Sequence, residues 1–239
     1  MEEGLRERKK RETRQRIADV AMGLFLAKGF DNVTVAEVAR AADVSVNTVF
    51  NYFGTKEDLF ADRQDVVVDL PARVLREREP GEGVVRAFRR DFLDAIAGRD
   101  WRYGLNQGSD VFAGIVAASP ALVARMREIQ EQRETALARA LADELDAAPE
   151  DLSPRLVAAQ VLAATRLLGA YAADRMAAGE DWTGIEPDLR TQAERAFDLL
   201  ESGLGDYGRR APAAGASRAS GGDDGDGDPE GDEQQGEGH

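Results

Sequence analysis

The chain has 239 residues, enough for one or two domains, and its 43% hydrophobic content is sufficient for a real core. It has no cysteine and one histidine, His239, which argues against a disulfide framework, histidine-based catalysis and thiolate or histidine metal sites. The sequence shows neither an apolar run of 18 residues nor a signal-peptide pattern, so we expect a cytoplasmic protein without a membrane span.

Enzyme activity is not expected. The sequence lacks the G-x-S-x-G and Walker patterns that mark common catalytic and phosphate-binding loops. With 45 acidic residues, a carboxylate pair could be found in many places and would indicate little. We therefore predict no catalytic residues, no metal site and no cofactor.

Charge is distributed unevenly along the chain, whose formal net charge is −14. The segment 211–239 carries eight acids and one arginine and has no hydrophobic pattern, so we expect 206–239 to be a disordered tail, either inert or competing for a basic surface. Residues 1–12 are expected to form a mobile basic arm, which is either a solvated charge run or a DNA contact. Because a DNA-binding face responds to its local field, an acidic total is compatible with DNA binding.

The first predicted helix runs from Thr13 to the residue before Gly29. Its apolar residues follow helical spacing and form one stripe: Ile17, Val20, Ala21, Leu24 and Phe25. Gly29 is expected to end the helix in a left-handed conformation, which costs glycine little.

The segment 34–60 predicts a helix-turn-helix. Thr34 and Glu37 have the spacing of a capping box, which opens a short helix ending near Ala42. Ser45 is expected to cap a second short helix from Val46 to about Phe53, with Val49, Phe50 and Phe53 directed inward. Two short helices joined by a tight turn are typical of DNA-binding modules, in which the second helix enters the major groove.

The polar face of the second helix is suited to base edges. Asn47 and Asn51 can donate and accept hydrogen bonds at an adenine edge, and Val46 and the Thr48 methyl group can pack on thymine. Thr34 and Lys56 lie at helix starts, where they are suited to phosphate oxygens. Alternatively, these are ordinary polar faces of core helices.

Residues 13–60 closely resemble the DNA-binding domain of the TetR/AcrR family of bacterial repressors. The residues that carry this resemblance are Ile17, Ala21, Leu24, Phe25, Gly29, Phe30, Thr34, Val35, Val38, Ala39, Val44, Ser45, Thr48, Val49, Phe50, Tyr52, Phe53, Lys56, Glu57, Asp58 and Leu59. The resemblance implies that positions 46, 47 and 50 approach bases, and that Thr34, Tyr52 and Lys56 hold phosphates. Where many family members have tyrosine this chain has Phe50, so a contact that needs that hydroxyl is in doubt. The expected DNA-binding residues are Thr34, Val35, Ser45, Val46, Asn47, Thr48, Phe50, Asn51, Tyr52 and Lys56.

The rest of the chain predicts helices only, so the expected fold is all-α, with a DNA-binding domain at 13–60 and a ligand-binding and dimerisation domain at 61–205. Thr55 and Asp58 open a helix through Leu70, which Pro71 should kink or break. Further helices are expected at 84–97 and 105–118, after Ser119-Pro120 to Leu145, after Ser153-Pro154 to Gly179, and from Pro187 to Leu204.

The resemblance also implies function. It implies a homodimer through residues 154–178 and 187–205 that binds a palindromic operator in double-stranded DNA, and a small-molecule effector that releases it. The alternative is a regulator of the same fold that responds to a protein partner and has no metabolite pocket. Side chains that could line an effector pocket, or equally belong to the core, are Phe88, Phe92, Trp101, Asn106, Gln107, Asp110, Phe112, Met126, Gln160, Arg166 and Tyr171.

Overall fold

The computed structural model describes residues 4–62 and 65–204, and all of the regular secondary structure in these ranges is helical. The predicted acidic tail from residue 206 onwards lies outside the described residues. In chain order the elements are α1 (Leu5–Lys28), α2 (Val35–Ala41), α3 (Val46–Tyr52), α4 (Lys56–Phe60), α5 (Asp65–Val68), α6 (Leu70–Arg76), α7 (Val84–Gly98), η2 (Trp101–Tyr103), α8 (Ser109–Ala118), α9 (Pro120–Leu145), α10 (Ser153–Ala177) and α11 (Trp182–Leu204). The predicted all-α fold is confirmed.

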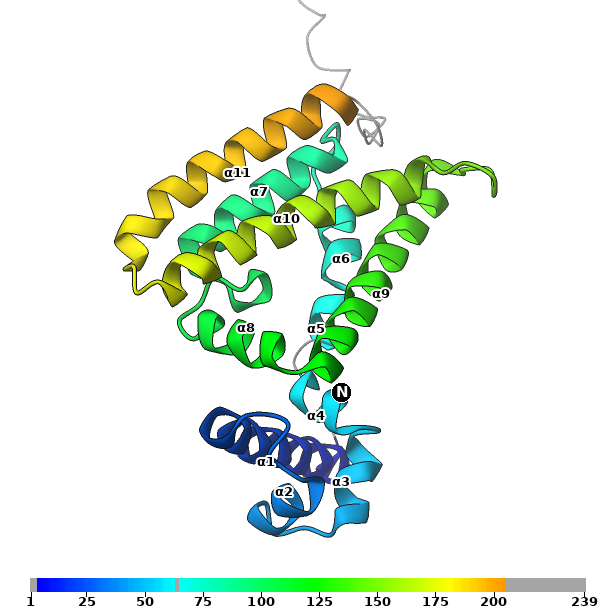
Figure 1. The fold of residues 1–239 in the computed structure, drawn as a ribbon. Coiled ribbons are helices and arrows are strands. Elements are labelled where there is room, and N and C mark those ends of the chain that lie inside the picture. The colour runs from blue at the N-terminus through cyan, green and yellow to red at the C-terminus, as the bar shows by residue number, and fades with distance from the viewer. Residues whose placement is uncertain (1–3, 63–64, 205–239) are drawn as a thin grey trace, which may run out of the picture.

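Two hydrophobic cores divide the molecule. The smaller core holds α1–α4 together, and its aromatic centre is formed by Phe25, Phe30 and Phe60, whose ring centroids are 5.1–5.8 Å apart. The larger core lies among α5–α7 and α9–α11, with Phe92 and Phe197 fully buried. Figure 1 shows the small bundle below the large one, and both views place α7, α10 and α11 side by side.

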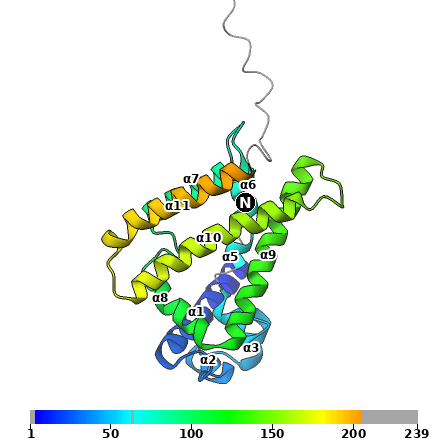
Figure 2. The same cartoon turned by 45° about the horizontal axis from the view of Figure 1, so that its top comes forward.

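Helix α9 belongs to both cores. Leu122, near its start, is fully buried in the small core, whereas Leu137 and Leu141 are fully buried in the large one. Its 26 residues correspond to about 39 Å of helix. Figure 2 shows α9 rising from the small bundle to the far end of α10. Because α9 is continuous, it connects the two domains rigidly.

The N-terminal prediction needs one correction. Residues 5–12 were expected to form a mobile arm, but α1 begins at Leu5, two turns earlier than predicted. Straight-chain basic residues have good helix propensity and can extend a helix that is already nucleated by its buried stripe. Gly29 ends α1 with a positive φ of 81° as predicted, but its ψ of 153° lies outside the left-handed helical region.

Two further helices differ from their predicted bounds. The single helix predicted through Leu70 is divided, because α4 ends at Phe60 and Pro71 lies in the first turn of α6, where a missing N–H costs no hydrogen bond. The last helix was predicted to start at Pro187, but α11 starts at Trp182 and contains Pro187 in its interior. Burial of Ile185 in the large core stabilises the turn that precedes this proline.

Helix α8 starts at Ser109, later than the predicted Leu105, because Gly108 precedes it with φ 89°. Pro120 opens α9 as predicted, but Ser119 makes no cap hydrogen bond. Its hydroxyl instead donates to Asp31 Oδ1 at 2.9 Å. Ser119 therefore joins the large domain to the α1–α2 loop.

Helix α10 is long and apolar enough to cross a membrane by length and composition alone. Its apolar residues Val157, Val161, Leu162 and Leu168 are instead buried against the neighbouring helices, as in the core helix of a globular domain.

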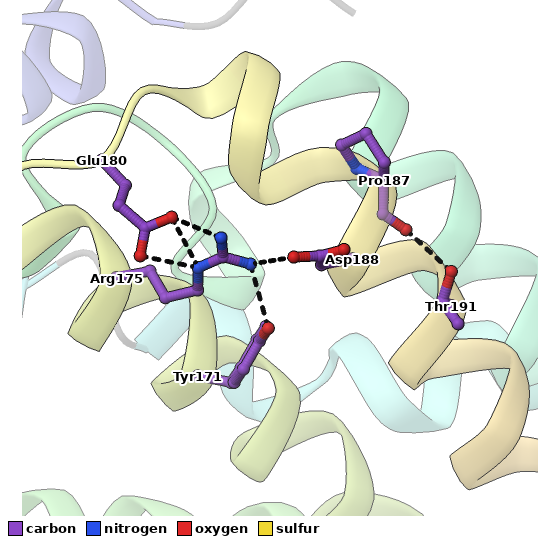
Figure 3. Close-up of polar contacts among 6 residues, drawn as sticks. All are labelled: Tyr171, Arg175, Glu180, Pro187, Asp188 and Thr191. Atoms are coloured by element: carbon purple, nitrogen blue, oxygen red, sulfur yellow. Dashed lines mark hydrogen bonds and ion pairs between the residues drawn. The ribbon is translucent and has the colours of Figure 1, made fainter.

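The turn between α10 and α11 is held by Arg175. Its guanidinium donates to the Glu180 carboxylate, to Asp188 Oδ2 at 2.7 Å and to the Tyr171 hydroxyl at 3.0 Å (Figure 3). The charge-assisted bonds from Arg175 lower the pKa of Glu180. Tyr171, a predicted pocket residue, thus accepts a hydrogen bond from the arginine that holds this turn.

Gly169 allows α10 to approach η2 closely, since a Cβ at this position would lie 2.5 Å from the Tyr103 carbonyl oxygen. We predict that Gly169→Ala lowers the free energy of unfolding by about 1–3 kcal/mol, because the backbone must shift. Gly114→Ala is the control: its Cβ would meet nothing within 4 Å, and it should stabilise helix α8 by about 0.5–1 kcal/mol. Urea denaturation measures both, and equal effects would contradict the proposed close approach.

Candidate nucleic-acid interface

The helix-turn-helix is formed by α2 and α3, and local hydrogen bonds fix both helix starts. Thr34 Oγ1 accepts from the Glu37 N–H at 3.2 Å, and Glu37 Oε2 accepts from the Thr34 N–H at 2.9 Å, which confirms the predicted capping box. Ser45 Oγ accepts from the Thr48 N–H at 3.0 Å and so caps α3 as predicted. The two short helices therefore begin at defined residues.

The turn between the helices is tight and needs no glycine. Asp43 has φ 53°, a left-handed conformation that aspartate tolerates better than most residues. The Val44 N–H donates to the Ala39 carbonyl at 2.9 Å, and the Ala42 N–H donates to Val38 at 2.9 Å. These bonds complete the end of α2 and direct the chain into α3.

Helix α3 has one buried face and one exposed face. Val49 and Phe53 are buried in the small core. Phe50 was predicted to point inward but is 49% exposed, which corrects that prediction. Position 50 lies about 100° around the helix from Val49 and one turn from Val46, so it falls on the outer face.

This outer face, formed by Val46, Asn47, Phe50 and Asn51, is called the α3 face below. All four residues are exposed, and the two asparagine side chains form no hydrogen bond with any described residue. The side chains of Thr48 and Tyr52 are half-buried beside it, and the Thr48 hydroxyl is hydrogen-bonded to Ser45 Oγ at 2.8 Å. The α3 face therefore presents two free amides between two apolar side chains.

Basic residues behind the α3 face hold the domain together. Arg14 donates to Asp62 at 2.8 Å and to the Tyr52 carbonyl at 2.9 Å, and its guanidinium lies 4.7 Å from the Phe53 ring centroid. Arg14 thus joins α1 to the end of α3. Nothing in the sequence distinguishes Arg14 from the basic residues around it, such as Arg11 and Arg16.

Lys56 also has an internal role that the sequence did not indicate. Its ammonium donates to the carbonyls of Phe30 and Val33 at 2.8 and 2.9 Å and lies over the Phe30 ring. Two of its three donors are therefore used within the protein, so a phosphate contact by Lys56 stays a prediction that depends on the third. Thr34 is exposed and Val35 half-buried at the start of α2, and the Thr34 hydroxyl donates to Glu37 at 2.9 Å.

The residues predicted to line an effector pocket are not brought together. Trp101 and Asn106 line an open hollow of about 580 Å³, whereas Phe88 and Phe92 are core residues and Phe112 stacks on Phe60 with a centroid distance of 4.9 Å. Gln160 and Arg166 lie on the exposed side of α10 and Gln107 is also exposed, which corrects their predicted place in a pocket wall. Asp110 and Met126 are half-buried. The hollow is lined by Asp91, Asp94, Ala95, Gly98, Arg99, Asp100, Trp101, Arg102 and Asn106.

Comparison with known proteins agrees with this geometry. Residues 17–62 match the family described as bacterial regulatory proteins, tetR family. The chain is 32% identical over 174 residues to the HTH-type transcriptional regulator TcmR of Streptomyces glaucescens, covering 69% of this chain and 75% of TcmR. It is 41% identical over 51 residues to AcrR of Shigella flexneri, a match that spans 21% of this chain and 24% of AcrR.

A solved structure of a SmeT–triclosan complex shares the fold, with a TM-score of 0.51 and 18% identity over 80% of this chain and 91% of SmeT. The helix-turn-helix and the match to TcmR define a DNA-binding transcriptional regulator, which is not an enzyme. The chain belongs to the TetR family.

The capping box of α2 predicts a pH dependence. The hydrogen bond from the Thr34 backbone N–H, followed by the contact with Lys28, holds the pKa of Glu37 at about 2, below its ordinary value of 4.5. A carboxylate with a lowered pKa stabilises the fold fully above pH 4.5, and this contribution is lost as the pH falls towards 2. Glu37→Gln should therefore have a lower melting temperature than the wild type at pH 7, and the difference should shrink below pH 4.5. A difference that stays constant with pH would contradict the charged capping box.

Proposed function

We propose that this TetR-family regulator is a repressor that binds a palindromic operator as a homodimer and is released by a small-molecule effector, in the cytoplasm. The observation that carries the DNA-binding part is the α3 face, whose free amides and apolar side chains stand out from a helix fixed at both ends.

Base recognition is assigned to the α3 face because of its chemistry. The Asn47 and Asn51 amides can each pair with the N6 and N7 atoms of adenine in the major groove. Val46 and Phe50 are exposed and apolar, which suits contact with thymine methyl groups. Phosphate contacts from Thr34, Tyr52 and the third donor of Lys56 would set the register of this face on DNA.

Dimerisation is assigned to α10 and α11 because both present leucines to solvent. Leu156 and Leu167 are 57% and 59% exposed on α10, and Leu199 is 70% exposed on α11. Leu156, Gln160, Ala163 and Leu167 follow the spacing of a single helix face, which corresponds to an unpaired packing surface. A twofold dimer would place two α3 faces on one duplex, as a palindrome requires.

Effector control is assigned to the contact between the domains, because a structural change in one domain can be transmitted there to the other. Arg125 on α9 forms an ion pair with Asp58 at 2.9 Å, and Asp58 also caps α4 by accepting from the Thr55 N–H at 3.0 Å. Phe112 on α8 stacks on Phe60 at the end of α4. A ligand that displaces α8 or α9 would therefore move the DNA-binding domain, provided that it binds the released state more tightly.

Asn47→Ala tests base recognition. We predict that it weakens specific operator binding by about 1–3 kcal/mol per subunit and relaxes the base preference at one operator position. The control Gln132→Ala changes an exposed amide on α9 and should have no effect. Mobility-shift titrations on operator and random DNA measure both variants, and an equal loss on the two DNAs would show that Asn47 does not contact a base.

Leu167→Glu and Leu199→Glu test the dimer. Each places a carboxylate in the proposed interface, so sedimentation should show a dimer for the wild type at micromolar concentration and mainly monomers for both variants. Leu26→Glu is the matched control, since Leu26 is 54% exposed on α1, outside the proposed interface. A monomeric wild type, or variants that dimerise like the control, would contradict this assignment.

A further inference from the structure

Among the described residues, Arg133 on α9 differs from three other arginines whose side chains are partly or fully buried. Arg78, Arg89 and Arg125 each form an ion pair, with Glu144, Asp198 and Asp58 respectively. Arg133 forms no hydrogen bond or ion pair with any described residue, and its Nε atom is buried. Burial lowers the pKa of Arg133.

The side chain of Arg133 faces the inside of the large domain. Ile129 and Leu137, one turn before and one turn after it, are buried in the protein, and Met126 lies about two turns before it on the same side of α9. A guanidinium on this stripe is therefore flanked along α9 by apolar side chains, where an unpaired charge is costly.

The polar groups near Arg133 do not neutralise it. The groups that interact electrostatically with Arg133 are Tyr103 and Glu134. The Tyr103 hydroxyl donates to Asp91 Oδ2 at 2.5 Å, and burial raises the pKa of Tyr103, so the phenol stays neutral. The Glu134 carboxylate accepts from Gln130 Nε2 at 2.9 Å and does not form an ion pair with Arg133.

We propose that Arg133 is the anion-binding residue of the effector site and that the effector is an apolar molecule with an acidic group. This inference rests on the proposed effector control. A guanidinium fork donates two parallel hydrogen bonds to a planar carboxylate, and it can also donate to sulfonate oxygens. The apolar residues on the same stripe, Met126 and Ile129, are suited to the body of such a ligand.

The open hollow is separate from Arg133, and its charge is unfavourable for an acidic ligand. Asp91, Asp94 and Asp100 line it. Of the two arginines that also line it, Arg102 donates to Asp100 Oδ2 at 2.8 Å, and the Arg99 guanidinium lies over the Trp182 ring. Arg133 does not line the hollow. An acidic ligand is therefore expected at Arg133 rather than in the hollow.

A matched pair of fluorescent probes tests the proposal. The probes are 8-anilinonaphthalene-1-sulfonate and N-phenyl-1-naphthylamine, which share one aromatic body and differ by the sulfonate group. The wild-type full chain should bind the sulfonate at least about tenfold more tightly than the neutral probe, as expected for a hydrogen-bonded charge pair. Arg133→Met should remove this preference while leaving the Kd for the neutral probe within about twofold, because it removes only the charge contact.

The controls address folding and surface binding. Arg127→Met changes an exposed arginine on the same helix and should keep the wild-type preference for the sulfonate. Arg133→Met should melt at or above the wild-type temperature, because it removes a half-buried charge that has no partner among the described residues. The proposal is overturned if Arg133→Met keeps the preference, if it weakens both probes equally, if it melts well below the wild type, or if the wild type binds neither probe.

The same probes separate this inference from the proposed function. If the sulfonate binds through Arg133 but does not release operator DNA from the wild type, the anion site is supported and its role as a control site needs a different acid. If a neutral ligand releases the DNA while Arg133→Met leaves sulfonate binding unchanged, effector control is supported and the anion site is wrong.

Discussion

The α3 face depends on the burial of Val49 and Phe53 in the small core. A helix of seven residues is not stable by itself in water, so its conformation must come from packing and caps. Val49 and Phe53 lie one turn apart on the buried face, which fixes the rotation of α3 about its axis. Once that rotation is fixed, Val46, Asn47, Phe50 and Asn51 must face outward.

Several contacts make this geometry rigid and connect it to the rest of the chain. Arg14 holds the end of α3 against α1, and Lys56 holds the loop between α1 and α2 against α4. Leu122 then inserts the start of α9 into the same small core. Because α9 continues into the large core, the position of the α3 face follows the packing of both domains.

The parts of the structure that the sequence predicted correctly depend on local spacing. The capping boxes at Thr34 and Thr55, the cap at Ser45 and the proline start of α9 involve residues at most three positions apart. The extension of α1 through residues 5–12 and the interior position of Pro187 were not predicted, since each depends on the stability of neighbouring turns. Phe50 was placed wrongly because a large apolar residue is normally buried, and only the rotation of α3 shows otherwise.

The roles of residues outside the helix-turn-helix were harder to predict from the sequence. Lys56 resembled a phosphate contact, and its two carbonyl partners come from residues 26 and 23 positions away in the chain. Gln160 and Arg166 interrupt an apolar helix, as pocket residues can, but they lie on its solvent side. Arg133 could not be singled out, because nothing in the sequence distinguishes an unpaired arginine from a paired one.

The central claim is that two α3 faces read the bases of one duplex. Selection of bound duplexes from a random DNA pool tests it most directly, since all candidate operator sequences compete for the protein in one binding reaction. Two α3 faces on one duplex should enrich a palindrome whose half-sites are centred about 10 base pairs apart, with adenine or thymine at positions facing Asn47. A pool that remains random after repeated rounds, or that converges on a single asymmetric half-site, would contradict base recognition by a pair of α3 faces.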